Sequence, residues 1–147
     1  MRLAGLAPAL LALASCRRAT TLEEFLTREI TLSDGFKLRA EVMTRPEDMM
    51  RGMMFRDEFP EGRGMLFIHG EPGRFSYWMY QVRIPLDILW LDAGRRIVEV
   101  SATTPPCKTV ASQCPKYGGH ENALVVLELP AGSIEKHNLR VGNTISF

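Results

Sequence analysis

Alternation of apolar and polar residues predicts a β-hairpin near the start of the folded domain. Apolar side chains occupy every second position in residues 30–32 and 36–42. A period of two places one set of side chains on a buried face of a strand. The Ser-Asp-Gly sequence at residues 33–35 separates the two runs and is typical of a turn. We therefore expect two paired, half-buried strands, with Glu41 among the charged side chains on the solvent face.

The pattern changes after this hairpin and predicts a short helix. Thr44 and Glu47 have the spacing of a capping box, in which each side chain bonds to backbone near the other residue. Pro46 falls in the first turn and Gly52 is a stop signal. Together these residues predict a helix over about residues 45–51.

The rest of the chain carries mostly strand signals. Its clearest hairpin joins the apolar runs 86–91 and 97–100 through an Asp-Ala-Gly-Arg turn. Run 123–129 is nearly continuously apolar, which predicts a strand buried on both faces. Further elements are expected as strands at 65–68, 75–79 and 144–147, a turn at 71–73, and a helix capped by Ser133 that ends near Asn138.

Many short strands with two brief helices predict a mainly β protein. Such elements assemble into a compact antiparallel β-sandwich or barrel-like domain. A chain of 147 residues suits one domain and can bury a sizeable core. We expect this domain to span residues 29–147, after a targeting segment at 1–15 and a tether at 16–28.

Four blocks in the middle of the chain carry a family resemblance. They are GMMFR at 52–56, GMLF at 64–67, FSYWM at 75–79 and IPLDI at 84–88. In this order they resemble a bacterial and archaeal family known as domain of unknown function 192. The resemblance extends over residues 38–147 and implies the same mainly β fold, but no established reaction.

The first sixteen residues have the pattern of an export signal. Arg2 supplies one positive charge, and residues 3–13 form an apolar run that is too short to span a bilayer as a helix. The run ends in LASC at 13–16, which resembles the bacterial lipobox. We expect lipidation of Cys16 and anchoring of the exported protein to the lipid bilayer of the cell envelope. The alternative is an ordinary secretory signal in which Cys16 has no role.

The two remaining cysteines predict a disulfide. Cys107 and Cys114 stand in a loop at 103–122 that is rich in Pro, Ser, Thr and Lys. An even pair in an exported chain is typical of a structural bridge, and closing eight residues is worth about 2.5 kcal/mol in the chain-entropy model. Their spacing fits neither a CxxC zinc site nor a redox-active pair. The family resemblance implies a similar loop.

Charge excludes one large class of partner. Lys and Arg total 18 against 17 for Asp and Glu, which gives a net charge of +1. Such balance supplies no field that attracts nucleic acid, and the basic residues are scattered. We therefore expect no nucleic-acid partner.

Familiar catalytic motifs are lacking, and methionine is the unusual residue. The chain contains no GxGxxG, GxxxxGK[ST], GxSxG or HExxH sequence, and its three histidines stand far apart. We therefore expect no cofactor and name no catalytic residue. Seven of the eight methionines lie between residues 43 and 79. Thioethers select Cu(I), but methionine also fills irregular core gaps. Met50 and Met53 form the one Met-x-x-Met pair, and since no histidine is close to that pair in sequence, packing is favoured over copper.

Asp87 is the most informative polar residue. It stands inside the apolar run 86–91, where an unpaired carboxylate is costly. Arg56 is the expected partner in a structural salt bridge. The functional interpretation places these two residues on one concave face with the following side chains: Tyr77, Trp78, Gln81 and Tyr117. This chain has Tyr80-Gln81 where family members commonly have Lys-Asn, which weakens any role carried over to that pair.

Two classes of function follow. The first is an envelope lipoprotein whose non-catalytic domain binds a small ligand or a protein partner at the candidate residues. The second is an enzyme of unrecognised mechanism, such as an envelope-polymer hydrolase that uses Asp87 as acid or base. Copper binding is the third hypothesis.

Overall fold

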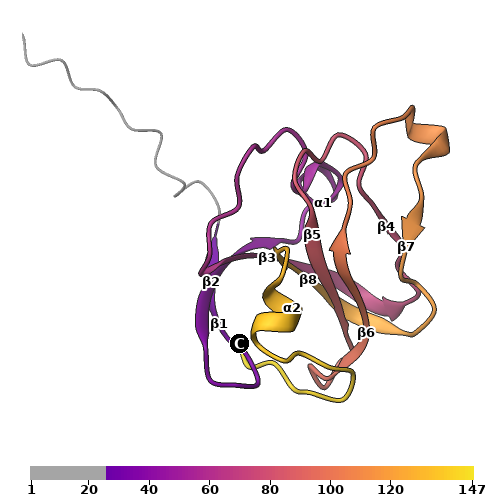
Figure 1. The fold of residues 1–147 in the computed structure, drawn as a ribbon. Helices are drawn as coiled ribbons and strands as arrows, with labels where there is room; N and C mark the ends of the chain where they lie inside the picture. The colour runs from indigo at the N-terminus through magenta and orange to yellow at the C-terminus, as the bar shows by residue number, and fades with distance from the viewer. Residues whose placement is uncertain (1–25) are drawn as a thin grey trace, which may run out of the picture.

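The computed structural model describes residues 26–147, which form one β-rich domain (Figure 1). The expected signal segment, the lipidation site Cys16 and residues 17–25 of the tether lie outside the described residues. No helix between residues 26 and 147 is long and apolar enough to cross a membrane. The elements are β1 (Thr27–Thr31), β2 (Lys37–Met43), α1 (Pro46–Arg51), β3 (Arg63–Gly73), β4 (Tyr77–Trp78), β5 (Leu86–Leu91), β6 (Ile97–Thr104), the 3-10 helix η1 (Ala111–Gln113), β7 (Lys116–Tyr117), β8 (Ala123–Pro130) and α2 (Ser133–Lys136).

Within the described part of the chain, a six-stranded sheet has the order β1-β2-β3-β8-β5-β6, and β4 and β7 form a separate small pair. The mainly β fold with two short helices is confirmed. The main sheet is mixed, because β2 and β3 are parallel, whereas we expected antiparallel pairing. A parallel pair needs a crossover connection, and residues 44–62 with α1 provide it. The two edge strands do not pair with each other, so the sheet is not a closed barrel.

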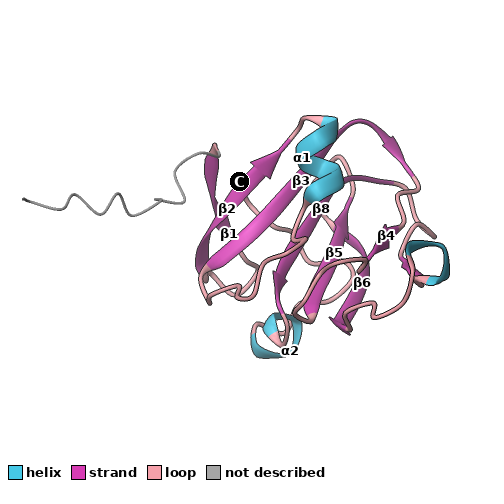
Figure 2. Ribbon diagram, turned by 90° about the horizontal axis from the view of Figure 1, so that it is seen from above, coloured by secondary structure: helices cyan, strands magenta, loops and turns pink. Residues whose placement is uncertain are grey.

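Both faces of the sheet are buried, each against its own apolar core. The first core contains Leu66 and Leu127, and α2 packs on it through Ile134. The second core contains Met65 and Val126, the sequence neighbours of those leucines. Because neighbouring residues of a strand point to opposite faces, the two cores lie on opposite sides of the sheet. Figure 2 shows α1 and α2 on opposite sides of the strands, in agreement with this division.

The C-terminal segment bridges the first edge of the sheet and the β5–β6 turn. Thr31 and Ser146 exchange backbone hydrogen bonds of 2.8 and 2.9 Å. The Ile145 N–H donates to the Arg95 carbonyl at 3.0 Å. The strand expected at residues 144–147 is therefore present only as isolated bridges. These bridges cover one end of the first core, in which Ile145 is fully buried.

Several local predictions need correction. The helix α1 begins after Arg45 without a side-chain cap, so the expected capping box is not formed. Helix α2 begins after Gly132, and the Ser133 hydroxyl instead donates to the Pro130 carbonyl at 2.6 Å. The strand β1 begins inside the expected tether, because Thr27 already pairs with β2. The Ser133 side chain thus bonds to a carbonyl three residues earlier in the chain, a local alternative to capping that short polar side chains offer.

Candidate functional site

A buried ion pair joins the segment after α1 to the second core. Glu41 lies on β2 and is 2% exposed, although alternation predicted it on a solvent face. Its carboxylate oxygens accept hydrogen bonds from Nη1 and Nη2 of Arg56, each at 2.7 Å. This two-point contact is the strongest geometry available to an arginine and a carboxylate. The face of β2 that we expected to be exposed is therefore covered by the crossover connection.

Two residues with positive φ direct Arg56 back toward the sheet. Gly52 ends α1 with a φ of 43°, in a position where a Cβ atom would lie 3.3 Å from the Phe67 ring. Phe55 has a φ of 66°, and its N–H donates to the Gln81 carbonyl at 3.0 Å. The sharp reversal brings the next residue, Arg56, over β2. The block at 52–56 that carried part of the family resemblance thus builds this turn.

A second buried carboxyl group, Glu128, lies in the same row of the sheet. Met65 on β3 pairs with Glu41 on one side and with Glu128 of β8 on the other. Glu128 is 5% exposed, and its Oε2 has no hydrogen-bond partner among residues 26–147. Burial raises the pKa of Glu128 to about 8, although the nearby Arg56 charge acts in the opposite direction. Glu128 is therefore mainly protonated at pH 7.

Arg63 adds a second cation to this cluster. Its Nη2 lies 3.8 Å from Oε1 of Glu41 and makes no hydrogen bond within the described part of the chain. Glu41 is thus shared between two guanidinium groups. Arg63 Nη2 and Glu128 Oε2 are both buried and have no hydrogen-bond partner among residues 26–147. Buried ionisable groups with incomplete hydrogen bonding are typical of functional sites as well as of structural networks.

A pocket of about 740 Å³, which we term the ion-pair pocket, opens beside this cluster. Glu41, Arg56 and Arg63 supply charged groups to its wall. Phe59 and Pro60 supply an apolar surface. The remaining lining residues are acidic, namely Asp57, Glu58 and Glu61. The volume lies in the range of sites for small molecules, and an apolar wall with a few fixed polar groups is their usual composition.

The expected Arg56–Asp87 pair is not formed. Asp87 is fully buried and accepts backbone hydrogen bonds from Thr103 at 2.6 Å and Ile134 at 2.7 Å. Its neighbour Ile88 pairs with Glu128 and so shares the face of the second core. Asp87 must then point to the opposite face, where Arg56 has no access. Asp87 is a structural acceptor that holds α2 and the end of β6 in place.

The expected aromatic residues come together in part. Tyr77 of β4 lies opposite Tyr117 of β7 in their short ladder. Tyr77 packs edge-on against Trp90 with ring centroids 6.0 Å apart, and burial raises the pKa of its phenol. Trp78 lines a second pocket, described below. The structure therefore separates the candidates into an Arg56 site, an aromatic site and the isolated Asp87, rather than one concave face.

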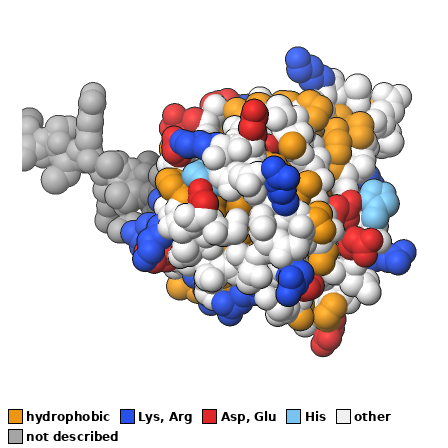
Figure 3. Space-filling model, turned by 60° about the horizontal axis from the view of Figure 1, so that its bottom comes forward, with side chains coloured by type: hydrophobic (Ala, Val, Ile, Leu, Met, Phe, Trp, Pro, Cys, Tyr) orange, Lys and Arg blue, Asp and Glu red, His pale blue; other side chains and the backbone are white. Residues whose placement is uncertain are grey.

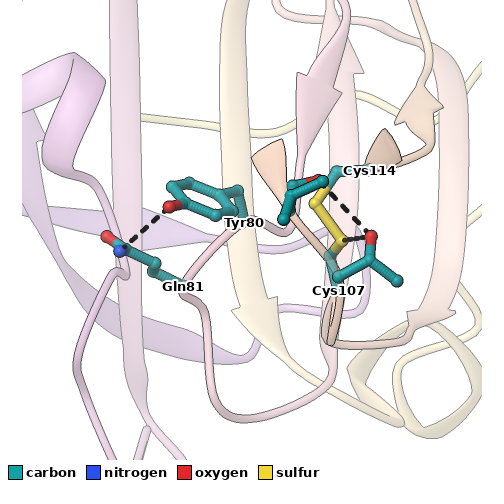
Figure 4. Close-up of a disulfide and its surroundings, with 6 residues drawn as sticks. Tyr80, Gln81, Cys107 and Cys114 are labelled. Atoms are coloured by element: carbon teal, nitrogen blue, oxygen red, sulfur yellow. Dashed lines mark hydrogen bonds between the residues drawn. A yellow bond between two sulfur atoms is a disulfide. The ribbon is translucent and has the colours of Figure 1, made fainter. Parts of the chain in front are cut away.

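The expected disulfide is present and closes the loop before β7. The Cα atoms of Cys107 and Cys114 are 5.7 Å apart, and η1 lies between the two residues. The Cys107 N–H donates to the Met79 carbonyl at 3.1 Å, which ties the loop to the end of β4. Figure 4 shows the bridge near Tyr80 and Gln81, where the Gln81 amide donates to the Tyr80 hydroxyl at 3.2 Å. The loop is thus fixed at both ends.

Sequence reasoning missed Glu41 and Glu128. Glu128 carried a usable signal, because it is the one charged residue in a run predicted to be buried on both faces. Glu41 carried none, since its alternation with apolar residues is also that of an exposed position. On the surface, Lys and Arg are interspersed with Asp and Glu over the face drawn in Figure 3, in keeping with the balanced composition.

The fold and site define a single β-rich domain with a buried acidic row beside a pocket. The family model DUF192, described as uncharacterised ACR, COG1430, matches residues 29–147. The chain therefore belongs to the DUF192 family. A search of curated proteins found no match.

Two solved structures share the fold. One is a protein of unknown function from Novosphingobium aromaticivorans DSM 12444, with a TM-score of 0.77 and 23% identity over 86% of this chain and 89% of the other. The second, from Sinorhizobium meliloti 1021, is proposed to be a transcription regulator. It has a TM-score of 0.74 and 23% identity over 83% of this chain and 94% of its own.

Proposed function

We propose that this protein is a bacterial envelope lipoprotein whose non-catalytic β-domain binds a small ligand in the ion-pair pocket. The export signal and the lipobox-like LASC sequence at residues 13–16 support the location. The Cys107–Cys114 bridge supports it independently, because disulfides persist in oxidising compartments.

The observation that carries the binding proposal is the wall of the pocket. Glu41 is held by two hydrogen bonds to Arg56, so its position is set before any ligand arrives. Preorganised polar groups lower the cost of binding. Phe59 and Pro60 offer an apolar surface next to them. The expected ligand is a small molecule with one apolar face and one hydrogen-bonding end.

The hydrolase alternative has less support. It assigned the role of acid or base to Asp87, whose two oxygens accept backbone N–H groups. The side chain is fully buried, so a substrate has no approach to it. A general acid or base must come within hydrogen-bond reach of its substrate. The concave ion-pair pocket also favours a small ligand over a flat protein partner.

A pocket-filling substitution tests the ligand proposal. Glu58 is exposed and lines the pocket, so Glu58→Trp should obstruct it without removing a buried contact. We expect one or more amino sugars or peptidoglycan fragments, which combine an apolar face with hydrogen-bonding groups, to raise the Tm of the wild type, as binding to the native state requires. The same compounds should have little effect on Glu58→Trp.

The matched control is Glu71→Trp, an exposed position on β3 that does not line this pocket. It should respond to the compounds as the wild type does. A panel without any Tm shift, or equal shifts in wild type and Glu58→Trp, would rule out ligand binding in this pocket.

The anchor has its own test. Cys16→Ala, expressed in a bacterial host, should release the protein from membranes or leave it unprocessed, because the acyl chains supply the membrane affinity. Fractionation and the mass of the mature protein measure this. A mutant that stays membrane-bound at its normal mature size would show that Cys16 is not the anchor.

A further inference from the structure

The seven methionines between residues 26 and 147 differ in burial. Met43, Met53, Met65 and Met79 are at most 2% exposed and belong to the second core, as core packing predicted. Met49 and Met50 on α1 do not belong to this buried set. Met50 is 66% exposed, so it contributes little to packing. Met49 is partly buried and packs against the edge of the second core, so on α1 the packing explanation leaves only Met50 without an account.

Met49 and Met50 share a pocket of about 360 Å³ with His69 and Trp78, which we term the methionine pocket. The four side chains come from three elements, α1, β3 and β4. His69 lies 19 residues after Met50 in the sequence, so only the fold brings it to these methionines. A histidine therefore does accompany these two methionines in space.

His69 is held in a fixed orientation. Its ring stacks on Phe75 with a centroid distance of 3.5 Å and an interplanar angle of 4°. Its Nε2 lies 3.2 Å from the Tyr77 hydroxyl oxygen. When Nε2 donates to that oxygen, Nδ1 keeps a free lone pair, which is the outer-shell arrangement typical of metal-bound histidines. Burial lowers the pKa of His69, which favours the neutral imidazole that metals require.

We propose that Met49, Met50 and His69 bind one Cu(I) ion in the methionine pocket, with the Trp78 indole beside it. Two thioethers and an imidazole form a soft donor set that prefers Cu(I) over hard divalent ions. The face of an indole attracts a cation. Among residues 26–147, no group of three or more His, Cys, Asp or Glu residues could hold a metal, so a hard-metal site does not compete.

This site is separate from the ion-pair pocket, and none of the four residues lines that pocket. The copper proposal therefore stands or fails independently of the proposed ligand. Arg74 also lines the methionine pocket, and its positive charge opposes that of a metal cation. Arg74→Gln is accordingly expected to raise the Cu(I) affinity.

An anaerobic competition titration of the mature protein against bicinchoninate tests the proposal. We expect one Cu(I) per chain. Met50→Leu should weaken binding by more than about tenfold, the loss that even an outer-shell change can cause. Because Met50 is exposed and Leu conserves volume, this variant should fold normally. His69→Gln should weaken binding at least as much.

Met54→Leu is the matched control, since Met54 follows α1 but does not line this pocket. It should bind Cu(I) as the wild type does. Binding should also quench the fluorescence of Trp78, and Trp78→Phe should abolish that signal although the buried Trp90 remains. Zn²⁺ should not compete.

Three results would overturn the proposal. They are no competition with bicinchoninate by the wild type, equal affinities of the wild type and Met50→Leu, and binding of Zn²⁺ as tight as that of Cu(I).

Discussion

Replacing Arg56 with Met is expected to lower the free energy of unfolding by about 3 kcal/mol, because Glu41 is left buried without its main partner. Glu41→Gln should cost less, since Arg56 is partly exposed and can reach water. The double variant should cost less than the sum of the two singles, with a coupling on the order of 0.5–3 kcal/mol. Denaturant unfolding of the four proteins measures the cycle.

Asp87→Asn provides the control for this cycle. It should destabilise by about 2 kcal/mol. Asp87 accepts hydrogen bonds from two backbone N–H groups, and in the variant the asparagine NH₂ group, itself a donor, would face one of them. Asp87 and Arg56 act on opposite faces of the sheet, so their effects should add. Additive effects of Glu41→Gln and Arg56→Met, or strong coupling between Arg56→Met and Asp87→Asn, would contradict the pairing seen in the structure.

Glu128 is expected to make the domain less stable as the pH rises. Its pKa is raised from 4.5 to about 8 in the folded state. Between these values the unfolded chain releases the proton while the folded chain keeps it, so the unfolded state gains stability. The stability that Glu128 contributes is fully present below about pH 4.5 and is lost as the pH rises through about 8. At about 1.4 kcal/mol per pKa unit, the loss is on the order of 5 kcal/mol.

Urea unfolding of the wild type and of Glu128→Gln between pH 5 and 8.5 measures this loss. Glutamine does not titrate, so the stability of the wild type should fall relative to that of the variant across the range. Glu29→Gln, at an exposed position, should follow the wild type in parallel. Parallel curves for the wild type and Glu128→Gln would mean that Glu128 titrates near its ordinary pKa.

Sequence patterns predicted the local elements well where neighbouring residues decide them. The hairpins at residues 30–42 and 86–100 formed as expected, because alternation and turn residues act over short distances. The Cys107–Cys114 bridge was also predictable, since the two cysteines are close in sequence. The parallel pairing of β2 and β3 was not, because it depends on the path of the crossover.

The candidate site was predicted only in part. Arg56 was expected to form a structural salt bridge with Asp87; it does form one, but its partner is Glu41. The strand pattern places Glu41 opposite the apolar face, and the pattern alone does not say whether that opposite face is covered. The crossover containing α1 covers it, so a residue expected in solvent lies at the centre of the site.

The sequence by itself determined the family, the mainly β class and the bridge, because each depends on motifs or periods within a few tens of residues. The tertiary structure alone decided which charges meet and which methionines stay outside the core. Asp87 and Glu128 lie on opposite faces of the sheet, because side chains alternate along a strand and Glu128 pairs with Ile88, the neighbour of Asp87. The path of the chain between α1 and β3 places His69 and Met49 in one pocket. Such contacts join residues far apart in the chain, where local patterns carry no information about distance.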